Sequence, residues 1–154
     1  HLLAQKPREE AGGVKLRLVS SQEFPISSSM TGALMDIAPG GLRTLHWHPN
    51  ADEWQYWIKG KGRLGIFDTG PHVATFDFNP GDIGYVKRNL GHYILNTGDT
   101  DLEFLAVFRA PQYQSVSLSD WLTHTPPEMV AQTLNVDPAV IARWPKNAPG
   151  IMPE

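Results

Sequence analysis

The sequence lacks cysteine, long hydrophobic runs and any excess of basic residues. Its 154 residues contain no Cys, which excludes disulfides and thiolate metal sites and leaves the redox compartment open. No apolar run approaches the length of a membrane span, and no signal peptide is visible. With 13 Lys and Arg against 16 Asp and Glu, the formal net charge is -3. The charge therefore gives no reason to expect nucleic acid or a membrane as a partner.

What is present is an ordinary globular composition, with 41% hydrophobic and 19% charged residues. A chain of this length suits one domain with a sizeable core. Because it begins at His1 rather than Met, we expect a processed product or a piece of a longer protein. The sequence does not distinguish a cytoplasmic from a secreted location.

Short alternating segments separated by turn residues dominate residues 14–109. Turn signals such as PGG, PNAD, KGKG and NPGD lie between them, and no helical period interrupts them. This pattern predicts an all-β protein, a sandwich or barrel of antiparallel strands. The strands are expected at 14–20, 30–37, 42–48, 53–58, 63–68, 73–78, 82–86, 92–96 and 102–108.

Three regions are predicted: a polar N-terminal arm or linker at 1–13, the barrel at 14–112 and a helical tail at 113–154. The arm would need an external surface to become ordered. In the tail, Thr125 before two prolines and Asp137 before another indicate helix starts. We expect two or three short helices that cover the barrel's flank or a neighbouring subunit with Met129, Val130, Leu134, Val140, Ile141 and Trp144.

One stretch carries candidate metal chemistry. His46 and His48 are two residues apart on an extended run, so their imidazoles point the same way and Trp47 points the other way. Glu53 opens the next strand after a turn, and His92 occupies a similar setting later. An HxH pair alone is a weak signal, but all four together predict one metal site. Imidazoles suit zinc, copper, nickel or iron, and a carboxylate with open positions also admits manganese.

The spacing of these residues resembles the first cupin motif, which runs from Gly40 through His46, His48 and Glu53 to Gly60. The segment GDIGYVKRNLGHYILN resembles the second motif, which ends at His92 and Asn96, with Lys and Asn at two turn positions where Pro and Gly are usual. From about residue 12 to 136 the chain resembles the C-terminal cupin domain of bicupin oxalate decarboxylases.

This resemblance implies a jelly-roll cupin barrel that holds manganese (Mn2+) through His46, His48, Glu53 and His92. It also implies a lyase that converts oxalate to formate and carbon dioxide, with dioxygen as co-oxidant. The chain would then be one domain of a two-cupin protein, either paired with an N-terminal cupin or assembled as a homo-oligomer. Oxalate oxidase and a non-catalytic structural manganese-binding half are the alternatives.

The resemblance places Arg43 in the pocket against the substrate carboxylate. Since Arg43 lies three residues before His46, a regular strand would turn it to the opposite face, as a solvated arginine. A bulge near Gly40-Gly41 or strong strand twist is therefore required for the substrate-binding role.

A proton donor is harder to find. The resemblance expects a glutamate where Ala106 stands, while Glu103 should face outward and the lid segment APQYQSVS contains no acid. Tyr113 matches a pocket tyrosine and can donate a proton or a hydrogen bond. Because general acids contribute strongly to such reactions, this departure keeps the domain's own turnover open.

Overall fold

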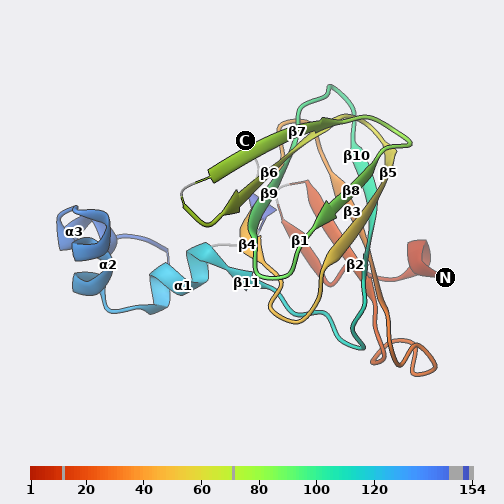
Figure 1. Cartoon of the computed structure of the whole chain (residues 1–154), viewed down its shortest axis with the longest axis horizontal. Helices are drawn as coiled ribbons and strands as arrows, with labels where there is room; N and C mark the ends of the chain where they lie inside the picture. The colour runs from red at the N-terminus through yellow and green to blue at the C-terminus, as the bar shows by residue number, and fades with distance from the viewer. Residues whose placement is uncertain (12, 71, 146–150, 153–154) are drawn as a thin grey trace.

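Two antiparallel sheets make up most of the chain (Figure 1). The computed structural model describes residues 1–11, 13–70, 72–145 and, for the backbone alone, 151–152. The first sheet has the order β1 (Glu9–Ala11), β2 (Val14–Val19), β3 (Thr31–Ile37), β10 (Leu102–Phe108), β5 (Glu53–Lys59), β8 (Ile83–Val86). The second has the order β11 (Val116–Ser117), β4 (Leu42–Trp47), β9 (Gly91–Asn96), β6 (Gly62–Asp68), β7 (His72–Phe78), and β12 (Ile151–Met152) also pairs with β4.

The core lies between the sheets and follows from strand alternation. Every second residue of β2 and β10 is buried, because successive side chains of a strand point to opposite faces. The prediction of an antiparallel all-β fold is confirmed, although the two sheets are not closed on each other. The core residues with the lowest exposure include Val14, Leu16, Ile37, Trp57, Leu64, Ile94, Leu102 and Phe104.

The N-terminal segment lies against the first sheet. A short 3-10 helix, η1 (Leu2–Ala4), is followed by β1, which pairs with β2 through the register Glu9↔Leu16 and Ala11↔Val14. The surface that this segment was expected to need is therefore supplied by β2 of the same chain.

In the described part of the chain, β11 is followed by three helices: α1 (Leu118–His124), α2 (Pro127–Leu134) and α3 (Pro138–Ile141). In Figure 1, α2 and α3 lie away from the barrel, at the far side of α1. Rather than covering the barrel, they pack on each other, and their small core consists of Val130, Ala131 and Ile141 with Leu122 and Trp144 against it. Met129, Leu134 and Val140 remain exposed. The predicted tail extends to residue 154, of which 146–150 and 153–154 lie outside the described residues.

The helix caps correct one prediction. Thr125 does not cap α2, since its hydroxyl donates to the Trp121 carbonyl of the preceding helix and α2 begins after Pro126 without a side-chain cap. Asp137 caps α3 by accepting from the Ala139 amide, as expected. Sequence reasoning missed α1, although Ser117 accepts a hydrogen bond from the Asp120 amide and so caps it.

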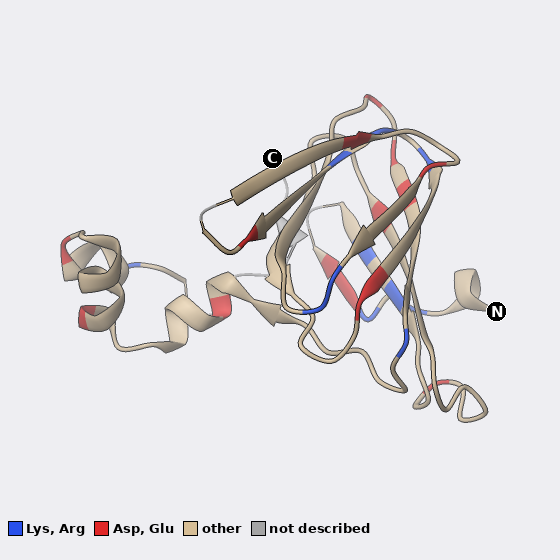
Figure 2. Cartoon of the chain, in the orientation of Figure 1, with Lys and Arg blue, Asp and Glu red and all other residues tan. Residues whose placement is uncertain are grey.

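Charged residues are interspersed over the two sheets (Figure 2). None of the helices in the described ranges has both the length and the apolar character required to cross a membrane.

Candidate metal centre

Four predicted ligands meet between the two sheets. His46 lies on β4 and pairs in register with His92 on β9, His48 follows the end of β4, and Glu53 opens β5. All four side chains are buried, and their ligand atoms lie within 4.8 Å of one another. The structure therefore brings together the whole set that the sequence predicted.

Backbone carbonyls orient the three imidazoles. The Nδ1 atoms of His46, His48 and His92 lie 2.6, 2.7 and 3.0 Å from the carbonyl oxygens of Thr44, Gln114 and Leu90, respectively. A carbonyl can only accept, so each Nδ1 carries the hydrogen and each Nε2 faces the cluster. Contacts of this type fix the tautomer and ring orientation of histidines that bind metals.

The carboxylate of Glu53 completes the cluster. Its Oε2 lies 3.0 Å from His92 Nε2 and 3.1 Å from His48 Nε2. Burial raises the pKa of Glu53, but its contacts with His48 and His92 outweigh burial and hold the pKa well below the usual range. Burial, with Arg43 nearby, lowers the pKa of His46 well below its usual value. An ionised carboxylate beside a neutral imidazole is a donor set suited to a divalent cation.

A β-bulge turns Arg43 into the same interior. In the pairing of β4 with β9, Arg43 opposes Ile94 and His46 opposes His92, so three steps on β4 match two on β9. The extra residue reverses the facing of Arg43 relative to a regular strand. The bulge thus lies between Arg43 and His46, not near Gly40-Gly41 as expected, and it leaves Arg43 only 3% exposed.

The segment after β10 closes over this arginine. Arg43 Nη2 donates to the Tyr113 hydroxyl at 3.2 Å and to the Ser115 hydroxyl at 3.0 Å. The same segment supplies the Gln114 carbonyl that accepts a hydrogen bond from His48. The side-chain amide of Asn50 donates to the backbone carbonyl of Gln112 at 2.8 Å. Residues 112–115 are therefore tied to the cluster and to the arginine.

The cavity beside the cluster is small, about 10 Å³, which is room for roughly one water molecule. Ala106 lines it, as expected, and Glu103 lies outside the lining. Among the described residues of that lining, Glu53 supplies the only carboxylate. The rest of the lining is mostly hydrocarbon, from Leu16, Ala33, Met35, Ile94, Phe104 and Phe108.

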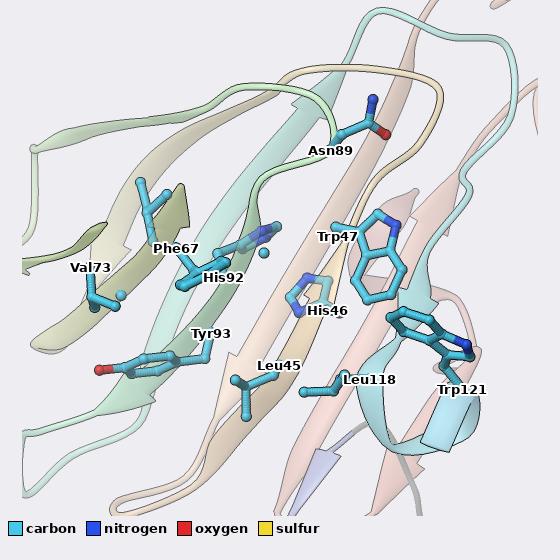
Figure 3. Close-up of a pocket in the computed structure, with 13 residues that line it drawn as sticks. Leu45, His46, Trp47, Phe67, Val73, Asn89, His92, Tyr93, Leu118 and Trp121 are labelled. Carbon is cyan, nitrogen blue, oxygen red and sulfur yellow. The ribbon is translucent and has the colours of Figure 1, made fainter. Parts of the chain in front are cut away.

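A larger hollow of about 500 Å³ lies on the outer side of β4, β9 and β6, against α1 (Figure 3). His46 and His92 contribute to it, but it is lined mainly by apolar side chains, among them Leu45, Phe67, Val73 and Trp121. Trp47, which points away from the cluster as predicted, meets Trp121 edge-on with ring centroids 5.9 Å apart. The ionisable groups converge in the small inner cavity, which is therefore the candidate reaction site.

Sequence reasoning missed two buried residues behind Glu53. The Gln55 amide donates to Glu53 Oε1 at 2.9 Å, and the Trp57 indole donates to Gln55 Oε1 at 3.2 Å. The alternation of Glu, Gln and Trp along EWQYW was the available signal, because it places the three on one strand face. The histidines left outside the site, His1, His72 and His124, are exposed, as expected.

The second motif retains its geometry despite its altered turn. Asn89, where the family usually has glycine, adopts a positive φ of 67°, a conformation that asparagine tolerates better than most residues. The substitution is therefore compatible with the same left-handed turn before His92.

The family model described as Cupin matches residues 1–142. The chain belongs to the cupin family. It is 43% identical to oxalate decarboxylase OxdC of Bacillus subtilis (strain 168) over 135 residues, which cover 88% of the chain and 35% of that protein. It is 41% identical to a probable oxalate decarboxylase of Arthroderma benhamiae, over 88% of the chain and 34% of the relative.

Solved structures show the same similarity. The structure of oxalate decarboxylase from Bacillus subtilis at pH 4.6 superposes with a TM-score of 0.93 and 38% identity, covering 99% of this chain and 40% of that one. A structure from work on the Mn(II) centres of the same enzyme superposes equally well. The predicted cupin fold and the resemblance to oxalate decarboxylases are confirmed. The chain spans about a third of the length of these curated relatives.

Proposed function

We propose that this chain is a manganese-binding cupin domain of the oxalate decarboxylase type, which converts oxalate to formate and carbon dioxide. The observation that carries the proposal is the convergence of His46, His48, Glu53 and His92 in a chain 43% identical to such an enzyme. In this proposal the four side chains are the metal ligands, and Arg43 and Tyr113 are the residues that meet the substrate.

The geometry of the cluster supports a six-coordinate cation. Ligand atoms about 2.1 Å from an octahedral divalent ion lie about 3.0 Å from their neighbours. Glu53 Oε2 lies 3.0 and 3.1 Å from the Nε2 atoms of His92 and His48. Four protein ligands on such a cation would leave further coordination positions for substrate or water. Since imidazoles also suit zinc and iron, manganese is proposed on the similarity to an enzyme whose Mn(II) centres have been studied.

The substrate proposed for this site is a small dianion. When bound, the metal would supply positive charge that polarises a carboxylate oxygen, and dioxygen is the co-oxidant that the family implies. Arg43 is the cationic side chain in the cavity lining, and a guanidinium holds a carboxylate through parallel charge-assisted hydrogen bonds. Because the cavity holds only about 10 Å³, we infer that residues 112–115 move when oxalate enters.

The reaction breaks the carbon–carbon bond of oxalate, releases carbon dioxide and adds one proton to the remaining carbon to give formate. Within the described lining, the Tyr113 hydroxyl is the only oxygen acid besides Glu53. Burial raises the pKa of Tyr113, which makes it a weak proton donor near neutral pH. The site is therefore better equipped to hold oxalate than to protonate the product.

That imbalance favours a second candidate, a structural manganese-binding half whose partner cupin carries the catalytic acid. Ala106 stands where the family resemblance expects a glutamate, and it lines the cavity. Metal bound only by the folded state would stabilise the fold directly. We also propose that the chain pairs with an N-terminal cupin or with further copies of itself, since it spans 35% of the length of its relative.

Metal and product analysis of the purified protein separates these functions. Stoichiometric manganese with formate from oxalate supports the decarboxylase. Manganese without turnover supports the structural half, and hydrogen peroxide in place of formate identifies an oxalate oxidase. Stoichiometric zinc in manganese-supplemented preparations, with no oxalate turnover, contradicts the proposed manganese enzyme.

A further inference from the structure

A buried hydrogen-bond chain stands behind the one carboxylate of the cluster. Gln55 is fully buried on β5, between Glu53 and Trp57 on the inward strand face. Its Nε2 donates to Glu53 Oε1 at 2.9 Å, and its Oε1 accepts from the Trp57 indole at 3.2 Å. An indole N–H can only donate, so it fixes which end of the Gln55 amide faces the carboxylate.

This hydrogen-bond chain gives the two carboxylate oxygens of Glu53 different roles. Oε1 accepts from Gln55, whereas Oε2 faces the Nε2 atoms of His48 and His92. A carboxylate free to rotate can present both oxygens to a cation and so occupy a coordination position that a substrate would use. With Oε1 engaged, only Oε2 is presented to the cluster.

We propose that Gln55 and Trp57 are positioning residues that hold Glu53 as a monodentate ligand and thereby keep a coordination position of the bound cation open. This inference rests on the proposed function in one respect, that the cluster binds a divalent cation. It goes beyond the four ligands because it assigns the carboxylate's binding mode to two side chains that do not reach the metal position.

Packing restrains both Gln55 and Trp57. The Trp57 ring stacks with Phe78 and with Phe104, at centroid distances of 4.7 and 5.3 Å. On the neighbouring strand β8, Gly84 is the register partner of Gln55, and a Cβ added there would lie 2.5 Å from Gln55 Oε1. The amide therefore occupies space that only a glycine at this position leaves open.

The test compares Gln55→Leu and Trp57→Phe with the wild type, with Tyr56→Phe as control. Tyr56 lies between them on β5 but points outward and is exposed. Manganese affinity is measured by titration, and the electron paramagnetic resonance spectrum of bound Mn(II) reports the symmetry of its ligands. We expect Gln55→Leu to weaken manganese binding about 10- to 100-fold, as is typical when a residue that hydrogen-bonds to a metal ligand is replaced. We also expect it to change the spectrum. Trp57→Phe should act less strongly in the same direction, and Tyr56→Phe should not.

The outcomes distinguish this inference from the proposed function. A wild-type protein that binds no manganese overturns both. Normal wild-type binding with an unchanged affinity and spectrum in Gln55→Leu overturns the positioning role alone. Weaker binding with an unchanged spectrum also overturns it, because a general packing defect would produce that result.

Gly84→Ala provides a second perturbation that retains both side chains and keeps the test decisive if Gln55→Leu does not fold. The backbone of Gly84 lies outside the left-handed region, so alanine is tolerated there apart from its contact with Gln55. We expect the added methyl to displace the amide and change the Mn(II) spectrum. A spectrum identical to the wild type contradicts the proposal.

Discussion

The two walls of the inner cavity differ in chemistry. The wall formed by β4, β5 and β9 carries the three imidazoles and the carboxylate, and each Nδ1 and the second carboxylate oxygen has a hydrogen-bond partner. The other wall, on β3 and β10 next to β5 in the first sheet, contributes Ala33, Met35, Phe104, Ala106 and Phe108. One wall carries a donor set suited to a divalent cation, and the described residues of the other supply apolar surface without an acid. This contrast teaches that the donor set for a cation can be complete in this fold while the position of a proton donor is filled by an apolar residue.

The largest effect is expected from removing a ligand. His92→Ala should abolish manganese binding, because it deletes one of four ligands and leaves Glu53 facing an empty position. A ligand present at about 100 times its Kd stabilises a folded protein by about 2.7 kcal/mol. The wild type should show that gain in urea denaturation with manganese, and His92→Ala should show none. His72→Ala, at an exposed histidine on β7, is the control, and an equal loss there would mean that the cluster is not the site.

Arg43→Lys tests the guanidinium that lies in the cavity lining beside the metal-ligand cluster. Lysine keeps the charge but loses the planar fork, and a hydrogen bond to a charged group contributes about 1.5–3 kcal/mol. We expect kcat/KM for oxalate, or oxalate affinity where turnover is absent, to fall about 10- to 100-fold while manganese content stays constant. Loss of manganese in this variant would show instead that Arg43 supports the ligand set.

Ala106→Glu would add an acid to the apolar wall and so remove the contrast between the walls. On the apolar wall burial raises the pKa of a carboxyl group, which favours the protonated form that can donate. A positioned general acid contributes about 100-fold or more, and for an unoptimised one we expect formate production to rise about tenfold.

Ala106→Gln is the matched control for that experiment, since it has the same size without the acid. Ala106 lies in register between Ala33 and Gln55 beside a cavity of about 10 Å³, so both variants should destabilise the fold, by about 1–3 kcal/mol. Equal formate production by the two variants would contradict the explanation that an acid is missing at position 106.

The wall that carries the three histidines and Glu53 could be predicted from sequence, because it depends on strand alternation and a short turn. His46 and His48 share a face by their spacing, and the turn before Glu53 returns the chain beside them. Arg43 could not be placed in this way. Its facing depends on a bulge visible only in the pairing of β4 with β9, and the family resemblance, not the strand period, predicted that its side chain enters the cavity lining.

The helical tail marks the other limit of sequence reasoning. Its apolar residues predicted burial against a surface, but the period of a helix does not say which surface. In the structure α2 and α3 satisfy part of that requirement on each other through Val130 and Ile141. Thr125 illustrates the same limit locally, because two helices adjoin it and its hydroxyl bonds to the earlier one.

The smallest effect is expected from Tyr113→Phe, which asks whether the residue that closes the cavity acts as an acid. Its hydroxyl accepts a hydrogen bond from the charged Arg43 guanidinium, and Arg43 keeps its hydrogen bond to the Ser115 hydroxyl when the phenol is removed. If the phenol only orients Arg43, formate production or oxalate affinity should fall about 2- to 10-fold. Burial raises the Tyr113 pKa further above neutrality, which argues for this modest result. A loss of about 100-fold in formate production with unchanged oxalate affinity would contradict it, because a change of that size is typical of a proton donor.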